Sequence, residues 1–95
     1  MAHFTLAPGR VSKAVRHRTV EEIWFITAGT GEMWRKTADE ETLTALSPGL
    51  SLTIPLGAAF QFRALGDAPL QALAITMPPW PGEDEAEFVA GRWQA

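Results

Sequence analysis

The stretch from His17 to Gly31, HRTVEEIWFITAGTG, decides the fold of this chain. Its centre, residues 23–27, is made of aromatic and β-branched residues, which are enriched in strands. The Gly29-Thr30-Gly31 sequence that follows has the backbone freedom that a tight turn requires. The stretch therefore predicts a strand over Glu22–Thr27 that ends in a hairpin turn.

Turn signals rich in glycine and proline recur on both sides of this stretch, with short apolar runs between them. A spacing of about 8–12 residues between turns is typical of an antiparallel sandwich or barrel. No segment has a helical apolar period of comparable length. We therefore predict an all-β antiparallel fold. The predicted strands are His3–Leu6, Val11–His17, Glu22–Thr27, Gly31–Lys36, Glu41–Leu46, Ser51–Ile54, Ala59–Ala64 and Leu70–Thr76.

The composition excludes several classes of partner. A formal net charge of −3 argues against a nucleic-acid partner, because binding to a phosphate backbone needs a clustered basic face. The early basic residues are interpreted as a solvated face. No apolar run approaches a membrane span, and the N-terminus lacks the layout of a secretory signal. We expect a cytoplasmic protein without a membrane or nucleic-acid partner. The basic residues concerned are Arg10, Lys13, Arg16 and Arg18.

Alternation along the predicted strand Glu22–Thr27 assigns its two faces. Glu22, Trp24 and Ile26 share one face. Ile23, Phe25 and Thr27 share the other. Both faces are largely apolar, which fits a barrel interior on one side and a second covered surface on the other. Since exposed sheet edges and faces otherwise promote aggregation, we expect a homodimer.

Four residues separate His17 from Glu22, and six separate Glu22 from Gly29. This spacing resembles the first motif of the cupin superfamily, in which two histidines precede the glutamate. The first of those histidines corresponds to Val15. A glycine in the same motif corresponds to Gly29.

A second segment resembles the other cupin motif. Gly49, Pro55 and Gly57 stand at the spacing of that motif, but Phe60 and Ala64 occupy its histidine and asparagine positions. The resemblance covers about half of the chain. It implies a jelly-roll-like cupin barrel over residues 1–77. Residues 78–95 then form a proline-rich, acidic tail that packs on the barrel or on a partner subunit.

The resemblance also implies a metal site, which this sequence retains only in part. Cupins with an intact site bind a divalent metal through three imidazoles and one carboxylate, and only His17 and Glu22 remain at these positions. Divalent metals in proteins usually need three or more protein ligands, so we expect neither a metal nor another cofactor. Residues outside the motifs are alternative donors: His3, Glu21 and Gln61.

The predicted ligand pocket consists of His17, Glu22, Trp24, Phe60 and Phe62. Aromatic walls with few polar groups are typical of small-molecule sites. The alternative is that the same rings simply fill the barrel as core, which is the commoner use of Trp and Phe. His17 and Glu22 are interpreted either as a structural pair or as an acid–base pair. Trp34, on the next predicted strand, is a weaker candidate because its face cannot be assigned.

The hypothesis from the sequence is a metal-depleted cupin-fold protein that binds a small, partly apolar organic ligand inside the barrel. One alternative is a cupin enzyme of isomerase, lyase or dioxygenase type that acts on a sugar or a small organic acid. Its only candidate catalytic residues are His17 and Glu22. The other alternative is a structural or regulatory module without a ligand of its own.

Overall fold

The structure is a computed structural model that describes residues 2–77 and 86–95, and this part of the chain contains nine β-strands and no helix. The predicted all-β antiparallel fold is confirmed. The strands are β1 (Ala2–Leu6), β2 (Val15–His17), β3 (Glu21–Ala28), β4 (Thr30–Lys36), β5 (Glu41–Leu46), β6 (Ser51–Ile54), β7 (Ala59–Leu65), β8 (Leu70–Met77) and β9 (Ala86–Phe88).

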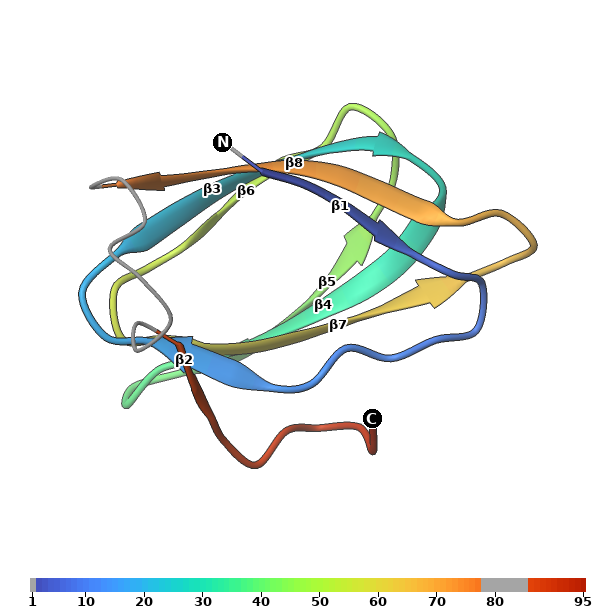
Figure 1. Cartoon of the computed structure of the whole chain (residues 1–95). Coiled ribbons are helices and arrows are strands. Elements are labelled where there is room, and N and C mark those ends of the chain that lie inside the picture. The colour runs from blue at the N-terminus through green and yellow to red at the C-terminus, as the bar shows by residue number, and fades with distance from the viewer. Residues whose placement is uncertain (1, 78–85) are drawn as a thin grey trace.

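The strands form two sheets that face each other (Figure 1). The first sheet has the order β1-β8-β3-β6, and the second has the order β5-β4-β7-β2-β9. Neighbouring strands within each sheet are antiparallel. Strands β3 and β4, which come from the central stretch, lie in different sheets, so the turn between them joins the two layers.

The glycines of this turn are required by close backbone contacts. Gly29 has a φ of 78°, and a Cβ atom there would lie 2.2 Å from the carbonyl oxygen of Pro69. A Cβ atom on Gly31 would lie 2.2 Å from the carbonyl oxygen of Arg63. Because no side chain fits at either position, the chain can cross between the sheets only with glycine here.

The predicted strand Val11–His17 is wrong in its first half, since the structure has a continuous strand only over Val15–His17. Val11 makes an isolated bridge to Arg63. The hydroxyl of Ser12 then accepts a hydrogen bond of 2.9 Å from the backbone N–H of Phe62, while the N–H of Ser12 donates to the carbonyl of Phe62. A side chain thus replaces a backbone acceptor and interrupts the ladder.

The described part of the C-terminal tail lies along the second sheet. Strand β9 pairs with β2, and this pairing was not predicted. Beyond it, the N–H of Val89 donates to the carbonyl of Ala14. Figure 1 shows the chain continuing from there beneath the sheet to the C-terminus. The first part of the predicted tail, residues 78–85, lies outside the described residues.

One part of the interior is filled by aliphatic side chains. Alternation along the strands turns these side chains inward from both sheets, and burial of such groups is the main favourable term in folding. Most of them come from the strand ends nearest the β3–β4 turn. The cluster includes Ile26, Met33, Leu46, Leu52, Ile54, Ala64, Leu70 and Ala72, all less than a tenth exposed.

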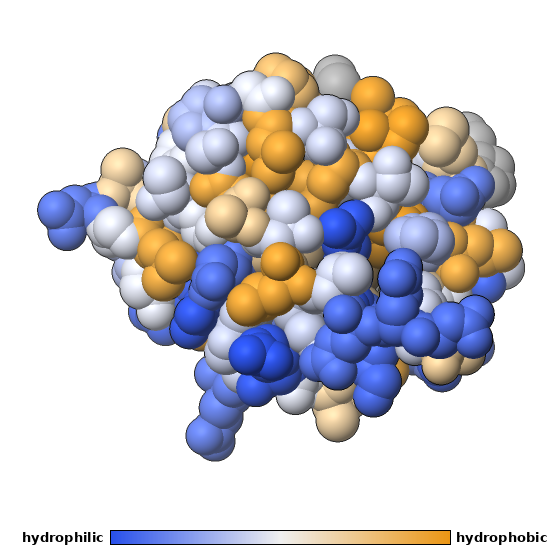
Figure 2. Space-filling view, turned by 180° about the vertical axis from the view of Figure 1, so that it is seen from behind, coloured by the Kyte–Doolittle hydropathy of each residue, from blue (hydrophilic) through white to orange (hydrophobic). Residues whose placement is uncertain are grey.

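The outer face of the first sheet carries apolar side chains as well. Phe25 on β3 and Ile75 on β8 are 45% and 46% exposed, and Ile23 pairs with Ile75 across the two strands. On the side of the molecule seen in Figure 2, hydrophobic residues instead form small groups between polar ones. Formation of a homodimer stays a prediction. The described residues include no helix that could span a membrane.

Candidate functional site

A cavity of about 620 Å³ lies between the two sheets, next to the filled part of the interior. Its wall comes from three strands of the first sheet (β1, β8 and β3) and two of the second (β2 and β7). The five residues predicted as a pocket all lie in this wall. The lining residues are Ala2, Phe4, Lys13, Val15, His17, Glu22, Trp24, Phe60, Phe62, Ala74 and Thr76.

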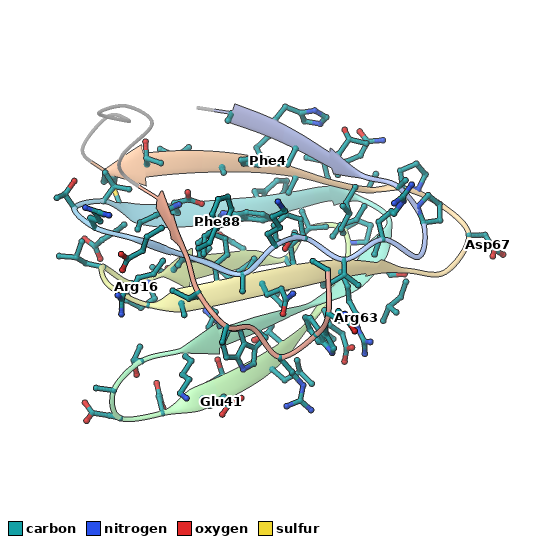
Figure 3. The ribbon with its side chains drawn as sticks, turned by 60° about the horizontal axis from the view of Figure 1, so that its bottom comes forward. Phe4, Arg16, Glu41, Arg63, Asp67 and Phe88 are labelled. Atoms are coloured by element: carbon teal, nitrogen blue, oxygen red, sulfur yellow. The ribbon has the colours of Figure 1, made fainter. Side chains whose placement is uncertain are left out.

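The cavity has its shape because small residues stand opposite large ones. Ala74 on β8 pairs in register with Trp24 on β3 and with Ala2 on β1. The short side chains of the two alanines leave the space into which the large rings of the opposite sheet project. Phe4 is 39% exposed on the edge strand β1 (Figure 3), so the cavity opens towards this edge.

The polar groups of the wall are concentrated around Glu22, which is only 4% exposed. Its Oε1 atom lies 3.2 Å from Nδ1 of His17, and its Oε2 atom accepts a hydrogen bond of 2.5 Å from Nε1 of Trp24. A buried carboxylate is costly unless it is paired and hydrogen-bonded, and these two contacts meet that condition. The indole ring and the imidazole therefore hold Glu22 at the cavity wall.

Aromatic rings make up most of the remaining wall. Trp24 stacks on Phe4 with ring centroids 5.3 Å apart, and it meets Phe62 edge-on at 4.9 Å. Phe60 packs edge-on against His17, with the centroids 5.2 Å apart. Contacts of this kind are preferred geometries of aromatic pairs, so the rings hold each other in place. The result is a surface suited to a flat or apolar group.

The donor set does not fit the metal that the cupin resemblance implies. Val15 and Phe60, at two of the ligand positions, lie in the cavity wall as hydrocarbon. The described part of the chain contains no group of three or more residues of the usual metal-ligating types arranged for an ion. His17 and Glu22 alone supply one nitrogen and one carboxylate, fewer than the three protein ligands of typical sites.

The alternative donors named from the sequence lie elsewhere. His3 and Glu21 are exposed and alternate with the cavity-lining residues of their strands, so they lie on the outer face of the first sheet. Gln61 is 1% exposed on the outer face of β7. Its amide nitrogen donates to the carbonyls of Ser12 and Trp93, and its oxygen accepts from the N–H of Trp93.

Trp34, the weaker candidate, does not line the cavity. It is buried on the outer side of β4, where its Nε1 atom donates to Glu41. The sequence interpretation missed three residues of the wall that carry chemistry or shape: Phe4, Lys13 and Thr76. Alternation along the predicted strand His3–Leu6 would have placed Phe4 inward, but it gave no sign that β1 lies beside the cavity.

The fold and the cavity define a class of protein: a small antiparallel β-barrel with a ligand-sized space between its two sheets. The family model described as "Cupin domain" matches residues 2–76. The chain therefore belongs to the cupin-domain family, and the resemblance noted in the sequence is confirmed.

The chain is also similar to larger proteins. It is 29% identical over 85 residues to the "Alginate biosynthesis protein AlgA" of Pseudomonas putida, covering 90% of this chain but 17% of that protein. Among solved structures, the capsular polysaccharide assembling protein CapF of Staphylococcus aureus matches 92% of this chain and 27% of its own, with a TM-score of 0.80 and 18% identity. The Drosophila melanogaster CENP-C cupin domain matches 78% of this chain and 54% of its own, with a TM-score of 0.73 and 13% identity.

The structural matches show the fold alone, and the sequence similarity to AlgA shows a distant relationship to an alginate biosynthesis protein. The chain spans about a sixth of the AlgA protein and about a quarter of CapF, as the covered shares of 17% and 27% give. The activities of those longer proteins are therefore not transferred to this chain by similarity alone.

Proposed function

We propose that this protein binds a small, partly apolar organic molecule in the cavity, without a metal at the cupin-motif positions. One observation carries the proposal: the cavity of about 620 Å³ is walled by Phe4, Trp24, Phe60 and Phe62 where a metal-binding cupin has imidazole in place of Phe60. Small-molecule pockets span about 300–1,000 Å³ and are mostly apolar with a few placed polar groups.

The chemistry of the wall matches such a ligand. The four rings offer dispersion contacts and burial of apolar surface, which contributes roughly 25 cal/mol per Å² removed from water. His17, Glu22 and Thr76 add polar groups at fixed positions. A ligand with one flat apolar part and one or two polar substituents therefore uses both components of the site.

A thermal-shift screen of small aromatic and alicyclic compounds tests the proposal. A ligand at about 100 times its Kd stabilises the folded state by about 2.7 kcal/mol, which raises the Tm of a domain this size by roughly 11–22 °C. Phe4→Ala should weaken any bound compound by roughly tenfold, because the ring covers the opening. Phe25→Ala is the matched control, since Phe25 is similarly exposed but lies on the outer face.

The screen contradicts the proposal if no compound class shifts the Tm, or if Phe25→Ala weakens binding as much as Phe4→Ala. The metal-free part has its own test. Nickel, iron, manganese and zinc should be substoichiometric in protein purified without an affinity tag. Phe60→His places a second imidazole near His17 and should tighten zinc binding by roughly tenfold or more. Stoichiometric metal on the unaltered protein would overturn this part.

An enzyme that acts on a sugar or a small organic acid is the second candidate function. The observation that favours it is the similarity to AlgA and CapF, whose names refer to alginate biosynthesis and capsular polysaccharide assembly. His17 and Glu22 would be the acid–base pair, since their side chains are in contact at 3.2 Å inside the cavity. Turnover of a sugar substrate that is lost in His17→Ala, with the fold retained, would favour this candidate over simple binding.

A further inference from the structure

The two charged side chains of the cavity wall that differ most, Lys13 and Glu22, differ in their exposure and in their contacts with other side chains. Lys13 is exposed, precedes the wall strand β2, and lines the cavity. No ion pair joins it to an acidic side chain among the described residues. Glu22, the one carboxylate among the lining residues, is buried and contacts His17 and Trp24. The wall thus offers an available positive charge at its exposed part and an engaged negative charge at its buried part.

Counting hydrogen-bond partners gives the same asymmetry. The ammonium group of Lys13 has three donors and no acceptor, and the hydroxyl of Thr76 can donate as well as accept. Each oxygen of Glu22 already has a contact, to His17 or to Trp24. A ligand that brings acceptors is therefore matched by the wall, whereas a ligand that brings an ammonium group meets Lys13 as a like charge.

The position of Lys13 is fixed on the β9 side of the opening. Its Nζ atom lies 5.1 Å from the centroid of the Phe88 ring, within the range of a cation–π contact. Phe88 is 75% exposed, and it pairs in register with Val15 of the cavity wall (Figure 3). Phe88 is not itself a lining residue of the cavity, so this contact places the ammonium group at the outer margin of the opening and leaves its remaining donors open to solvent or to a ligand.

We infer that the cavity selects organic anions, chiefly carboxylic acids with an aromatic or apolar body, whose carboxylate binds Lys13 at the opening while the body packs between Phe4, Trp24 and Phe62. This inference rests on the proposed function, because it names the ligand class of the same cavity. It adds an orientation: the charged end points outward and the apolar end points inward.

Three probes that share one body and differ in their end group test the inference: 4-phenylbutyrate, 4-phenylbutyramide and 4-phenylbutylamine. Their Kd values are measured by calorimetry at low and high salt. The acid should bind roughly two- to fivefold tighter than the amide, and the amine weakest, because a partly exposed ion pair contributes modestly. The advantage of the acid should shrink at high salt, since exposed charges are screened.

Lys13→Gln should bring the acid to the affinity of the amide and leave the affinity of the amide unchanged. Arg10→Gln is the matched control, because it removes one positive charge from an exposed position outside the cavity wall. Equal binding of all three probes would overturn the inference and leave the proposed function standing. Tighter binding of the amine, an acid-to-amide ratio that Lys13→Gln does not change, or no binding of any probe would also overturn it. The proposed function itself is tested separately: it fails if no compound in the thermal-shift screen changes the Tm.

Discussion

The two ends of the barrel interior are built from the same strands but are packed differently. Towards the β3–β4 turn, aliphatic side chains close the space, and we call this part the filled half. Towards the opposite ends, aromatic rings face alanines and leave the cavity, which we call the hollow half. On four strands the change occurs within one step of two residues: Phe4 to Leu6, Trp24 to Ile26, Phe62 to Ala64 and Ala74 to Ala72.

This comparison separates the residues that stabilise the fold from those that shape the site. In the filled half each side chain fits against others, so the free energy of unfolding depends on every methyl group. In the hollow half part of the aromatic surface faces the cavity and not other side chains. A ligand in the cavity can supply the packing contacts that the protein itself does not make there. Substitutions should therefore lower the stability mainly in the filled half and the ligand affinity mainly in the hollow half.

The largest expected effect is in the filled half. Ile26→Ala removes a fully buried side chain and should lower the free energy of unfolding by about 2–5 kcal/mol, measured by urea denaturation. Phe4→Ala in the hollow half removes a larger but half-exposed ring, and it should cost less than about 2 kcal/mol. Equal losses for the two variants would mean that the hollow half is packed like a core.

A sharper comparison uses two alanines on the same face of β8. Ala72→Leu places extra carbon in the filled half and should cost about 1–3 kcal/mol of unfolding free energy. Ala74→Leu points into the cavity, where there is room, so its cost should stay below about 1 kcal/mol while ligand affinity falls by at least roughly tenfold.

Urea denaturation and the compound screen check both alanine variants side by side. If Ala74→Leu destabilises the protein as much as Ala72→Leu, the space beside Ala74 is not available to a ligand. If the Ala74→Leu variant binds compounds with the same affinity as the unaltered protein, the ligand lies elsewhere.

The smallest effect concerns β9, which borders the hollow half. Arg16 donates a hydrogen bond of 2.7 Å to Glu87, and this bond, with the nearby charges of Arg16 and Arg18, lowers the pKa of the Glu87 carboxyl below its usual value. A carboxyl whose pKa is lowered by folding stabilises the native state above its unfolded pKa of about 4.3, and this contribution is lost as the pH falls through the lowered folded value.

Glu87→Gln should therefore destabilise the protein slightly at pH 7, and the difference should decrease as the pH is lowered from 7 to about 2. Urea denaturation of both proteins at the two pH values measures this. Because the two side chains are about half and about a third exposed, the effect at pH 7 should also decrease with added salt. A difference between the two proteins that is independent of pH would contradict the ion-pair explanation.

Alternation and turn residues predicted the all-β fold and the inward direction of Trp24, and the cupin resemblance placed Phe60 at the cavity. Period-two alternation reports which face of a strand a residue occupies, but it does not report how far along the barrel the interior is filled. Trp24 and Ile26 follow the same rule, yet only Trp24 lines the cavity. That difference depends on Ala74 across the sheet, which is a non-local contact.

Other features of the structure were not predicted from the sequence, and each has a physical reason. The strand expected over Val11–His17 is interrupted because the hydroxyl of Ser12 takes the place of a backbone acceptor, and strand propensity does not include that bond. Lys13 was interpreted as a solvated residue, as most lysines are, and only its location beside the opening distinguishes it. Strand β9 has few strand-forming residues and depends on its pairing with β2.

The amide of Gln61 joins a residue near the start of the chain to one near its end, through the carbonyls of Ser12 and Trp93. One of the two segments leads into β2, the short strand that carries Val15 and His17, and the other follows β9, which pairs with β2. A change at Trp93 would thus remove an anchor of the strand that forms part of the cavity wall. The placement of an affinity tag becomes an experimental variable, and binding data from differently tagged proteins are comparable only when this anchor is intact.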